Sequence, residues 1–172
     1  HGFVYFGVTL LNDGPELLEI NVRPGDPEFV ALLGLLKSSF RDLIDYAANG
    51  KLHQANVTWH KDLFSGAVFA MGAGYPDTMP PEPVPITGAA NAVSAGNAVV
   101  EDIGCDSEGQ HIVTGGRVIA SIATGPSIEA VRDRIHETLA QVHFEGMHHR
   151  TDLGYGLDPR LFAKPGDQPT SG

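Results

Sequence analysis

The sequence predicts an α+β fold in two parts: a β-hairpin with two helices up to about residue 56, then a small, mainly antiparallel sheet with one helix. Two runs rich in branched and aromatic residues flank a turn sequence at 12–15. Apolar residues then recur at helical spacing in two successive segments. After residue 57, short apolar runs alternate with glycine and proline, which is typical of short strands joined by turns.

The first part is expected to contain strands at 3–11 and 17–22, joined as a hairpin. Asp26 and Pro27, followed by an acid, form a helix-start signature in which Asp26 is the N-cap and Pro27 the first helical residue. A second helix is expected from about 39 to 48, where an Asn-Gly pair ends it. These elements predict a compact hairpin-helix unit.

The second part is expected to contain one helix among short strands. Ser127 can cap this helix, whose apolar stripe is Ile128, Val131, Ile135 and Leu139. The expected strands are 64–73, 84–87, 98–103, 111–114, 117–124 and 142–144. The predicted division is therefore 1–56, 57–156 and a polar tail at 157–172.

Composition excludes several classes of function. The net charge of −10 would repel nucleic acid, and no cluster of Lys or Arg offsets it. No apolar run is long enough to cross a bilayer, so we expect no membrane partner. Cys105 is the single cysteine, which fits a reducing, cytoplasmic location. Because His1 is not an initiator Met, we expect a fragment of a longer reading frame.

Three polar residues near the end of the second strand suggest a ligand site. Alternation along a strand places Glu19 and Asn21 on one face. A carboxylate beside an amide oxygen suits Mg²⁺, although an exposed polar strand face has the same composition. Arg23 follows, and its guanidinium can bind a phosphate or a carboxylate with two hydrogen bonds.

Residues 18–28 resemble the signature Glu-Phe-Asn-x-Arg-Phe-Gly-Asp-Pro-Glu of the phosphoribosylamine–glycine ligases, which are ATP-grasp enzymes of purine biosynthesis. Further stretches of this chain match the family in order and spacing. They are Gly-Phe-Val-Tyr-Phe-Gly at 2–7, Leu-Lys-Ser at 36–38, Gly-Tyr-Pro at 74–76, Gly-Gly-Arg-Val at 115–118 and Arg-Thr-Asp-Leu-Gly at 150–154.

The resemblance implies that 1–56 is the end of an ATP-grasp catalytic domain. Residues 57–156 would be the family's C-terminal domain, similar to the small hybrid-type sheet domain of biotin carboxylases. The implied activity is that of a nucleotide-binding ligase, which joins glycine to 5-phosphoribosylamine through a glycyl phosphate. ATP would be the co-substrate and Mg²⁺ or Mn²⁺ the metal.

The resemblance also implies roles for individual residues. Glu19 and Asn21 fall on the family's metal ligands, and Arg23 falls on its catalytic, anion-contacting arginine. Gly25, Asp26 and Glu28 fall on substrate-binding positions. Helix capping and a favourable dipole contact also explain the two acids without any ligand. The turn at 115–117 resembles one that faces the active-site cleft, and a plain hairpin turn with a solvated arginine is the alternative.

Several departures from the family leave other functions open. Pro24 stands where the family usually has Phe. The turn at Thr114 lacks the residue that the family usually has between this Thr and the following glycines. The domain for phosphoribosylamine and the ATP-contacting lysines do not lie in this chain, so we expect it to be inactive alone and to need those segments in cis or in trans. One alternative is an ATP-grasp ligase with a different amine and acid. The other is a noncatalytic binding module derived from such a ligase.

Overall fold

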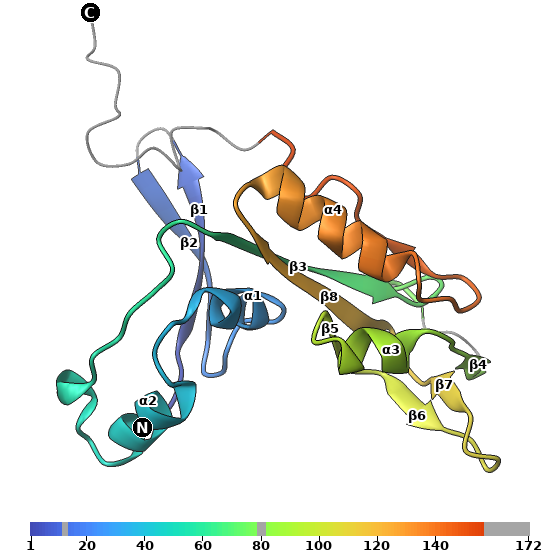
Figure 1. Ribbon diagram of the computed structural model, residues 1–172, viewed down its shortest axis with the longest axis horizontal. Coiled ribbons are helices and arrows are strands. Elements are labelled where there is room, and N and C mark those ends of the chain that lie inside the picture. Colours follow the sequence, from blue (N-terminus) through green and yellow to red (C-terminus); the bar gives the residue numbers. More distant parts are fainter. Residues whose placement is uncertain (12–13, 79–81, 157–172) are drawn as a thin grey trace, which may run out of the picture.

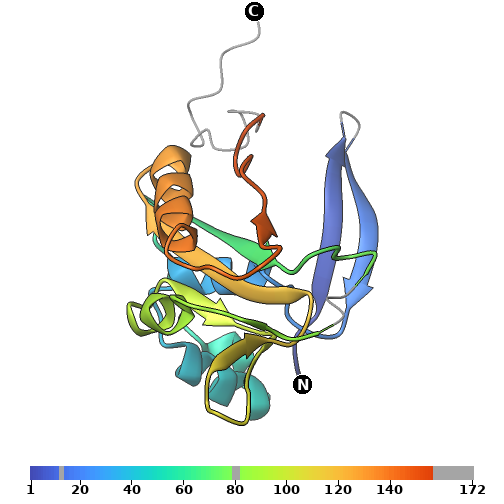
Figure 2. The same cartoon turned by 90° about the vertical axis from the view of Figure 1, so that its right-hand side faces the viewer.

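The computed structural model describes residues 1–11, 14–78 and 82–156. It is a mixed structure of short antiparallel sheets and helices, as the sequence predicts (Figure 1). In the view turned by 90°, the first hairpin stands on one side of the molecule and the last helix on the other (Figure 2). None of the helices in the described ranges is long and apolar enough to span a membrane.

The first two strands form the predicted antiparallel hairpin, β1 (Tyr5–Leu11) and β2 (Gly14–Asn21). Tyr5 pairs with Asn21 in the ladder, and Gly7 pairs with Glu19. The register then shifts by one residue between Gly7 and Val8, because β2 contains a bulge. The pairs from Tyr5–Asn21 to Gly7–Glu19 share one register, so the end of the hairpin that carries Glu19 is regular.

The first helix, α1 (Glu28–Leu35), begins differently from the prediction. Asp26 is not its N-cap: Pro27 precedes the first helical residue, and no side chain caps this end. The carbonyl of Gly25 instead accepts a hydrogen bond from the amide of Phe29. The prediction is wrong because the carboxylate of Asp26 is bound by a residue from the second half of the chain.

The second helix, α2 (Phe40–Ala48), confirms its prediction. Ser39 is the N-cap, and its hydroxyl accepts a hydrogen bond from the amide of Asp42. Gly50 follows the helix with a φ of +67°, a conformation that glycine adopts without strain. A short 3₁₀ turn, η1 (Leu52–Gln54), then leads toward the main sheet.

The main sheet has the strand order β5-β8-β3-β9, and a smaller sheet has the order β4-β7-β6. All their described pairings are antiparallel. The bounds of the main sheet are β3 (Phe64–Met71), β5 (Ala98–Val100), β8 (Arg117–Gly125) and β9 (His148–His149). Those of the smaller sheet are β4 (Val84–Pro85), β6 (Ile103–Cys105) and β7 (His111–Val113).

Helices α1 and α4 (Ile128–Leu139) cover opposite faces of the β3–β8 pair. Gly34 of α1 lies against Ser65, whereas Gly66 lies against Val131 of α4. Neighbouring residues of a strand point to opposite faces, so the two helices enclose these strands. The predicted stripe of α4 is confirmed at Val131, Ile135 and Leu139, which are buried in the core, whereas Ile128 is only half-buried.

Three predictions for the second part are wrong. Residues 98–103 do not form one strand, because β5 ends at Val100 and β6 begins at Ile103 in the other sheet. Residues 142–144 form no strand and contribute a single bridge to Thr87. Helix α3 (Ala89–Ser94) was not predicted, because six residues are too few to establish a helical period.

Candidate functional site

Glu19 and Asn21 lie at the end of β2, on the face that the alternation predicts. Gly7 lies opposite Glu19, and a Cβ at Gly7 would be 2.7 Å from Cγ of Glu19. Glycine therefore makes room for the Glu19 side chain on this face. The hairpin brings the acid and the amide together, as the sequence indicates.

Asn21 has an unusual environment for an amide. Its Nδ2 atom is buried and has no hydrogen-bond partner among the described residues. Buried polar side-chain atoms usually have a partner. The two ends of an amide exchange by a 180° turn of the side chain, so this position can present either a donor or an acceptor to a ligand.

Tyr5 pairs with Asn21 in the hairpin and interacts with Glu28 and Glu19, and sequence reasoning missed it. Partial burial, followed by the negative charges of Glu28 and Glu19, raises the pKa of Tyr5, and Arg23 opposes the shift. The phenol is thus protonated at neutral pH. Its place in the Gly-Phe-Val-Tyr-Phe-Gly stretch was a signal that could have identified it.

Gly25 is buried where the loop at 22–27 turns from β2 into α1. A Cβ at this position would be 2.7 Å from Oε2 of Glu28 and 2.8 Å from the Tyr5 ring. No side chain fits there without movement of its neighbours. The packing of Tyr5 and Glu28 thus explains why a glycine is at position 25. Glu28 itself is exposed at the start of α1.

Arg23 is exposed on the same loop. Its Nη1 atom donates a hydrogen bond to the carbonyl of Pro24, at 2.9 Å. Within the described ranges it makes no ion pair with Asp or Glu. The guanidinium can therefore bind an anion from solution without first breaking a salt bridge.

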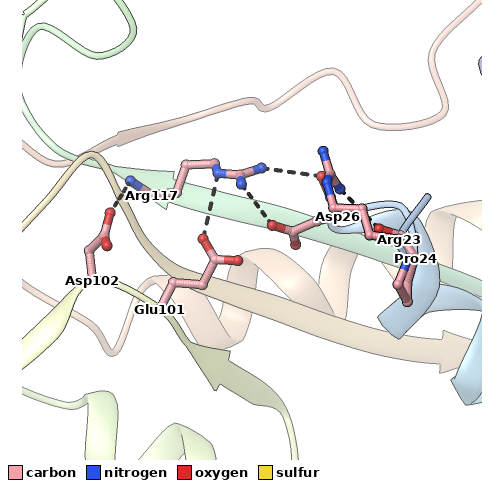
Figure 3. Close-up of polar contacts among 6 residues, drawn as sticks. All are labelled: Arg23, Pro24, Asp26, Glu101, Asp102 and Arg117. Atoms are coloured by element: carbon pink, nitrogen blue, oxygen red, sulfur yellow. Dashed lines mark hydrogen bonds and ion pairs between the residues drawn. The ribbon is translucent and has the colours of Figure 1, made fainter. Parts of the chain in front are cut away.

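Asp26 is bound by Arg117, the first residue of β8 (Figure 3). The Nη2 atom of Arg117 lies 2.8 Å from Oδ2 of Asp26, and Nη1 donates to the Asp26 carbonyl at 3.2 Å. The Nε atom lies 3.5 Å from Oε2 of Glu101. One guanidinium thus contacts both the main chain and the side chain of Asp26.

The turn that carries Arg117 is fixed by Asp102. The Asp102 carboxylate accepts a hydrogen bond from the Arg117 amide at 3.0 Å and occupies the space that a Cβ on Gly115 would need. The turn joins β7 to β8, which lie in different sheets. The alternative of a plain hairpin turn with a solvated arginine is wrong.

Glu101 is the second acid beside this guanidinium. Partial burial, then a hydrogen bond to Asp26 and the negative charge of Asp26, raises the pKa of Glu101 from 4.5 to about 7, and Arg117 opposes the shift. Glu101 is therefore partly protonated near neutral pH. Glu101 and Asp102 occupy the break between β5 and β6, so sequence reasoning that placed them inside one strand missed their role.

A cavity of about 700 Å³ lies elsewhere, between α1, β5, β8 and α4. Its lining includes Val30, Thr124 and Arg134, and it contains none of the candidate site residues. We consider the β2–α1 junction the better candidate site, because the acids, the amide and the exposed arginine lie there.

The fold and this site define an α+β protein in which a carboxylate, an amide and an arginine meet where a strand leads into a helix. The chain belongs to the family of the phosphoribosylglycinamide synthetase C domain, whose model matches residues 65–156. That match covers more than half of the chain. The family resemblance seen in the sequence is confirmed.

Named relatives agree with this membership. The chain is 35% identical over 165 residues to a phosphoribosylamine–glycine ligase of Vibrio cholerae, covering 95% of this chain and 38% of the relative. It is 32% identical over 154 residues to the trifunctional purine biosynthetic protein adenosine-3 of Gallus gallus, covering 90% of this chain and 15% of that protein. The chain thus spans well under half the length of either relative.

A solved structure has the same fold. The crystal structure of a phosphoribosylamine–glycine ligase from Thermotoga maritima matches with a TM-score of 0.67 and 28% identity. The match covers 87% of this chain and 36% of that one. The similarity therefore extends beyond the residues that the family model matches.

Proposed function

We propose that this chain is the C-terminal part of an ATP-dependent ligase that joins glycine to 5-phosphoribosylamine in purine biosynthesis. The observation that carries the proposal is the grouping of Glu19, Asn21 and Arg23 at the end of β2, in a chain whose relatives bear that ligase name. We also propose the cytoplasmic location that the sequence predicts.

Glu19 and Asn21 are the proposed ligands of Mg²⁺ or Mn²⁺. Both can offer oxygen, the atom that these hard cations prefer, and the unpartnered Asn21 amide fits a ligand role. No group of three or more His, Cys, Asp or Glu in the described ranges could hold a metal ion. Mg²⁺ commonly takes its remaining ligands from substrate phosphates and water. When bound, it would neutralise charge on the ATP phosphates.

Arg23 is the proposed catalytic residue. Phosphoryl transfer from ATP to the glycine carboxylate forms glycyl phosphate and releases ADP. The amine of phosphoribosylamine then attacks the acyl carbon, forms the amide bond and displaces phosphate. A fixed cation stabilises the phosphoryl oxygens as their charge redistributes, and the exposed Arg23 guanidinium can supply it. Gly25, Asp26 and Glu28 are the proposed substrate contacts from the adjoining loop and helix.

The same proposal assigns residues 1–56 to the end of an ATP-grasp domain, 57–156 to the C-terminal domain and 157–172 to a tail. The last of these lies outside the described residues. Support for assigning residues 1–56 to an ATP-grasp domain comes from the hairpin face opposite Glu19. On this face Phe6 and Ile20 are each 57% exposed and Val22 is 89% exposed. An apolar face of this kind usually packs against another surface, and we propose the preceding part of the ATP-grasp domain.

The proposal therefore concerns the assembled ligase. By this we mean the chain joined to, or mixed with, the segments that its relatives carry outside the match. The chain alone is expected to be inactive, because the ATP-contacting lysines of the family do not lie within it.

The test is a product assay by mass spectrometry. The assembled ligase is supplied with ATP, Mg²⁺, freshly generated phosphoribosylamine and one amino acid at a time. We expect glycinamide ribonucleotide and ADP with glycine. A product with another amino acid alone would assign a different substrate pair. No nucleotide hydrolysis with any amino acid would contradict the ligase and favour the noncatalytic module.

A further inference from the structure

Arg117 connects the second half of the chain to the 22–27 loop by two different bonds. Its Nη2 atom pairs with the Asp26 carboxylate at 2.8 Å, and its Nη1 atom donates to the Asp26 carbonyl at 3.2 Å. Bonds to the side chain and the main chain of one residue restrict its position more than an ion pair alone. Figure 3 shows the guanidinium reaching from the start of β8 to this loop.

Arg117 is also held in place by contacts with residues other than Asp26. The Asp102 carboxylate accepts a hydrogen bond from the Arg117 amide at 3.0 Å. The Cζ atom lies 5.1 Å from the centre of the Phe69 ring, and Glu101 lies beside Nε. Arg117 is only partly exposed, so fewer side-chain conformations are lost when it binds the loop.

Asp26 lies at the point where a shift would affect the whole site. Arg23 precedes it on the loop, and Gly25 is packed between Tyr5 and Glu28 with no room for a Cβ. The Gly25 carbonyl also accepts the bond from the Phe29 amide that begins α1. A displacement of Asp26 would move the residues that the proposed function assigns to substrate.

We propose that Arg117 is a positioning residue of the ligase site, which fixes the 22–27 loop, and with it Arg23, by binding the side chain and the main chain of Asp26. The proposal rests on the proposed function for its catalytic consequence, but its structural claim stands alone. Arg117 touches neither metal nor substrate in this role. It acts through Asp26.

The structural claim is tested by hydrogen exchange in the 172-residue chain. In Arg117→Ala, the Phe29 amide is expected to exchange about tenfold faster or more, because a charge-assisted bond to the loop is lost. The Val131 amide, which bonds Ser127 in α4, should keep its protection. Unchanged exchange at Phe29, or equal acceleration at both amides, would overturn the proposal.

The catalytic consequence is tested in the assembled ligase. Arg117→Ala should lower kcat by about tenfold to a hundredfold, since small displacements of a reacting group are costly. Arg117→Lys should be intermediate, because an ammonium is a point charge without the planar fork. The matched control is Arg134→Ala, since Arg134 binds Thr124 at the other end of β8. It should leave kcat within about twofold.

The outcomes separate the two proposals. Accelerated exchange at Phe29 with kcat unchanged in Arg117→Ala would overturn the positioning role and leave the ligase intact. A wild-type assembly without ligase activity would contradict the proposed function, and the exchange result would still decide whether Arg117 fixes the loop. If Arg117→Ala does not fold, Arg117→Lys is compared with Arg134→Ala in both assays.

Discussion

Asp26 and Arg117 are 91 residues apart in sequence, yet their charged groups lie 2.8 Å apart and fix the entrance to α1. Asp26 therefore links the 22–27 loop to the start of β8. The local sequence, in which Asp precedes Pro and Glu, indicated an N-cap instead. The difference between these roles can be measured.

The ion pair predicts energetic coupling between Asp26 and Arg117. In a double-mutant cycle of Asp26→Ala and Arg117→Ala, the free energies of unfolding should be non-additive by about 1 kcal/mol, a value reduced by the partial exposure of both side chains. Urea unfolding of the 172-residue chain measures it. Ser39→Ala, which removes the cap of α2, should be additive with Arg117→Ala. Additivity of the first pair would contradict an energetic contribution from the ion pair between Asp26 and Arg117.

The raised pKa of Glu101 predicts a pH-dependent stability. Partial burial raises this pKa from 4.5 to about 7, with contributions from Asp26 and Asp102 and opposition from Arg117. Between these values the unfolded state loses the proton first, so the raised pKa makes stability fall as pH rises from about 4.5 to 7. Glu101→Gln should remove this fall.

Urea unfolding at pH 5 and pH 8 tests the Glu101 prediction. The Gln variant should gain stability relative to wild type at the higher pH. Glu108→Gln is the matched control, because it removes the same charge from a residue that forms no ion pair within the described ranges. A pH dependence that is the same in both variants and wild type would mean that Glu101 titrates normally.

Gly25 should not tolerate a side chain. In Gly25→Ala the new Cβ would meet Glu28 at 2.7 Å and the Tyr5 ring at 2.8 Å. The loop must move, and we expect a loss of about 1–3 kcal/mol in unfolding free energy, as for other overpacked sites. Gly2→Ala has open space and should change stability by less than about 0.5 kcal/mol. Equal unfolding midpoints for the two variants would contradict the close packing described for Gly25.

Arg23 should affect catalysis with little effect on stability. Its side chain is exposed and bonds only its neighbour Pro24 among the described residues. In the assembled ligase, Arg23→Ala should reduce kcat/KM by about a hundredfold, as loss of a charge-stabilising group does in other enzymes. Arg41→Ala, on the exposed surface of α2, should be close to wild type. Steady-state kinetics that were equal for the two variants would make Arg23 a surface residue.

Local patterns predicted the elements that local interactions stabilise. The hairpin of β1 and β2, helix α2, the Ser127 cap of α4 and the buried positions Val131, Ile135 and Leu139 follow from turn, cap and period rules, and the structure confirms them. The same rules predicted one strand across 98–103, because they cannot show that Glu101 and Asp102 lie between two sheets.

The candidate site was predictable only in part. Glu19 and Asn21 share a strand face, so their proximity follows from alternation. Tyr5 joins them through strand pairing, and Arg117 reaches Asp26 through the packing of α1 on β3 and β8. These contacts depend on tertiary structure, which a sequence pattern does not encode residue by residue.

The most direct test of the account is the binding of Mn²⁺ with ATP to the assembled ligase, followed by electron paramagnetic resonance. Glu19→Gln and Asn21→Ala should each weaken Mn²⁺ binding by about tenfold or more, because the first removes the negative charge of one ligand and the second removes an oxygen ligand. Glu16→Gln removes a charge from the same strand and should leave the affinity unchanged. Equal Mn²⁺ affinity in wild type and all three variants would contradict a metal site at the end of β2.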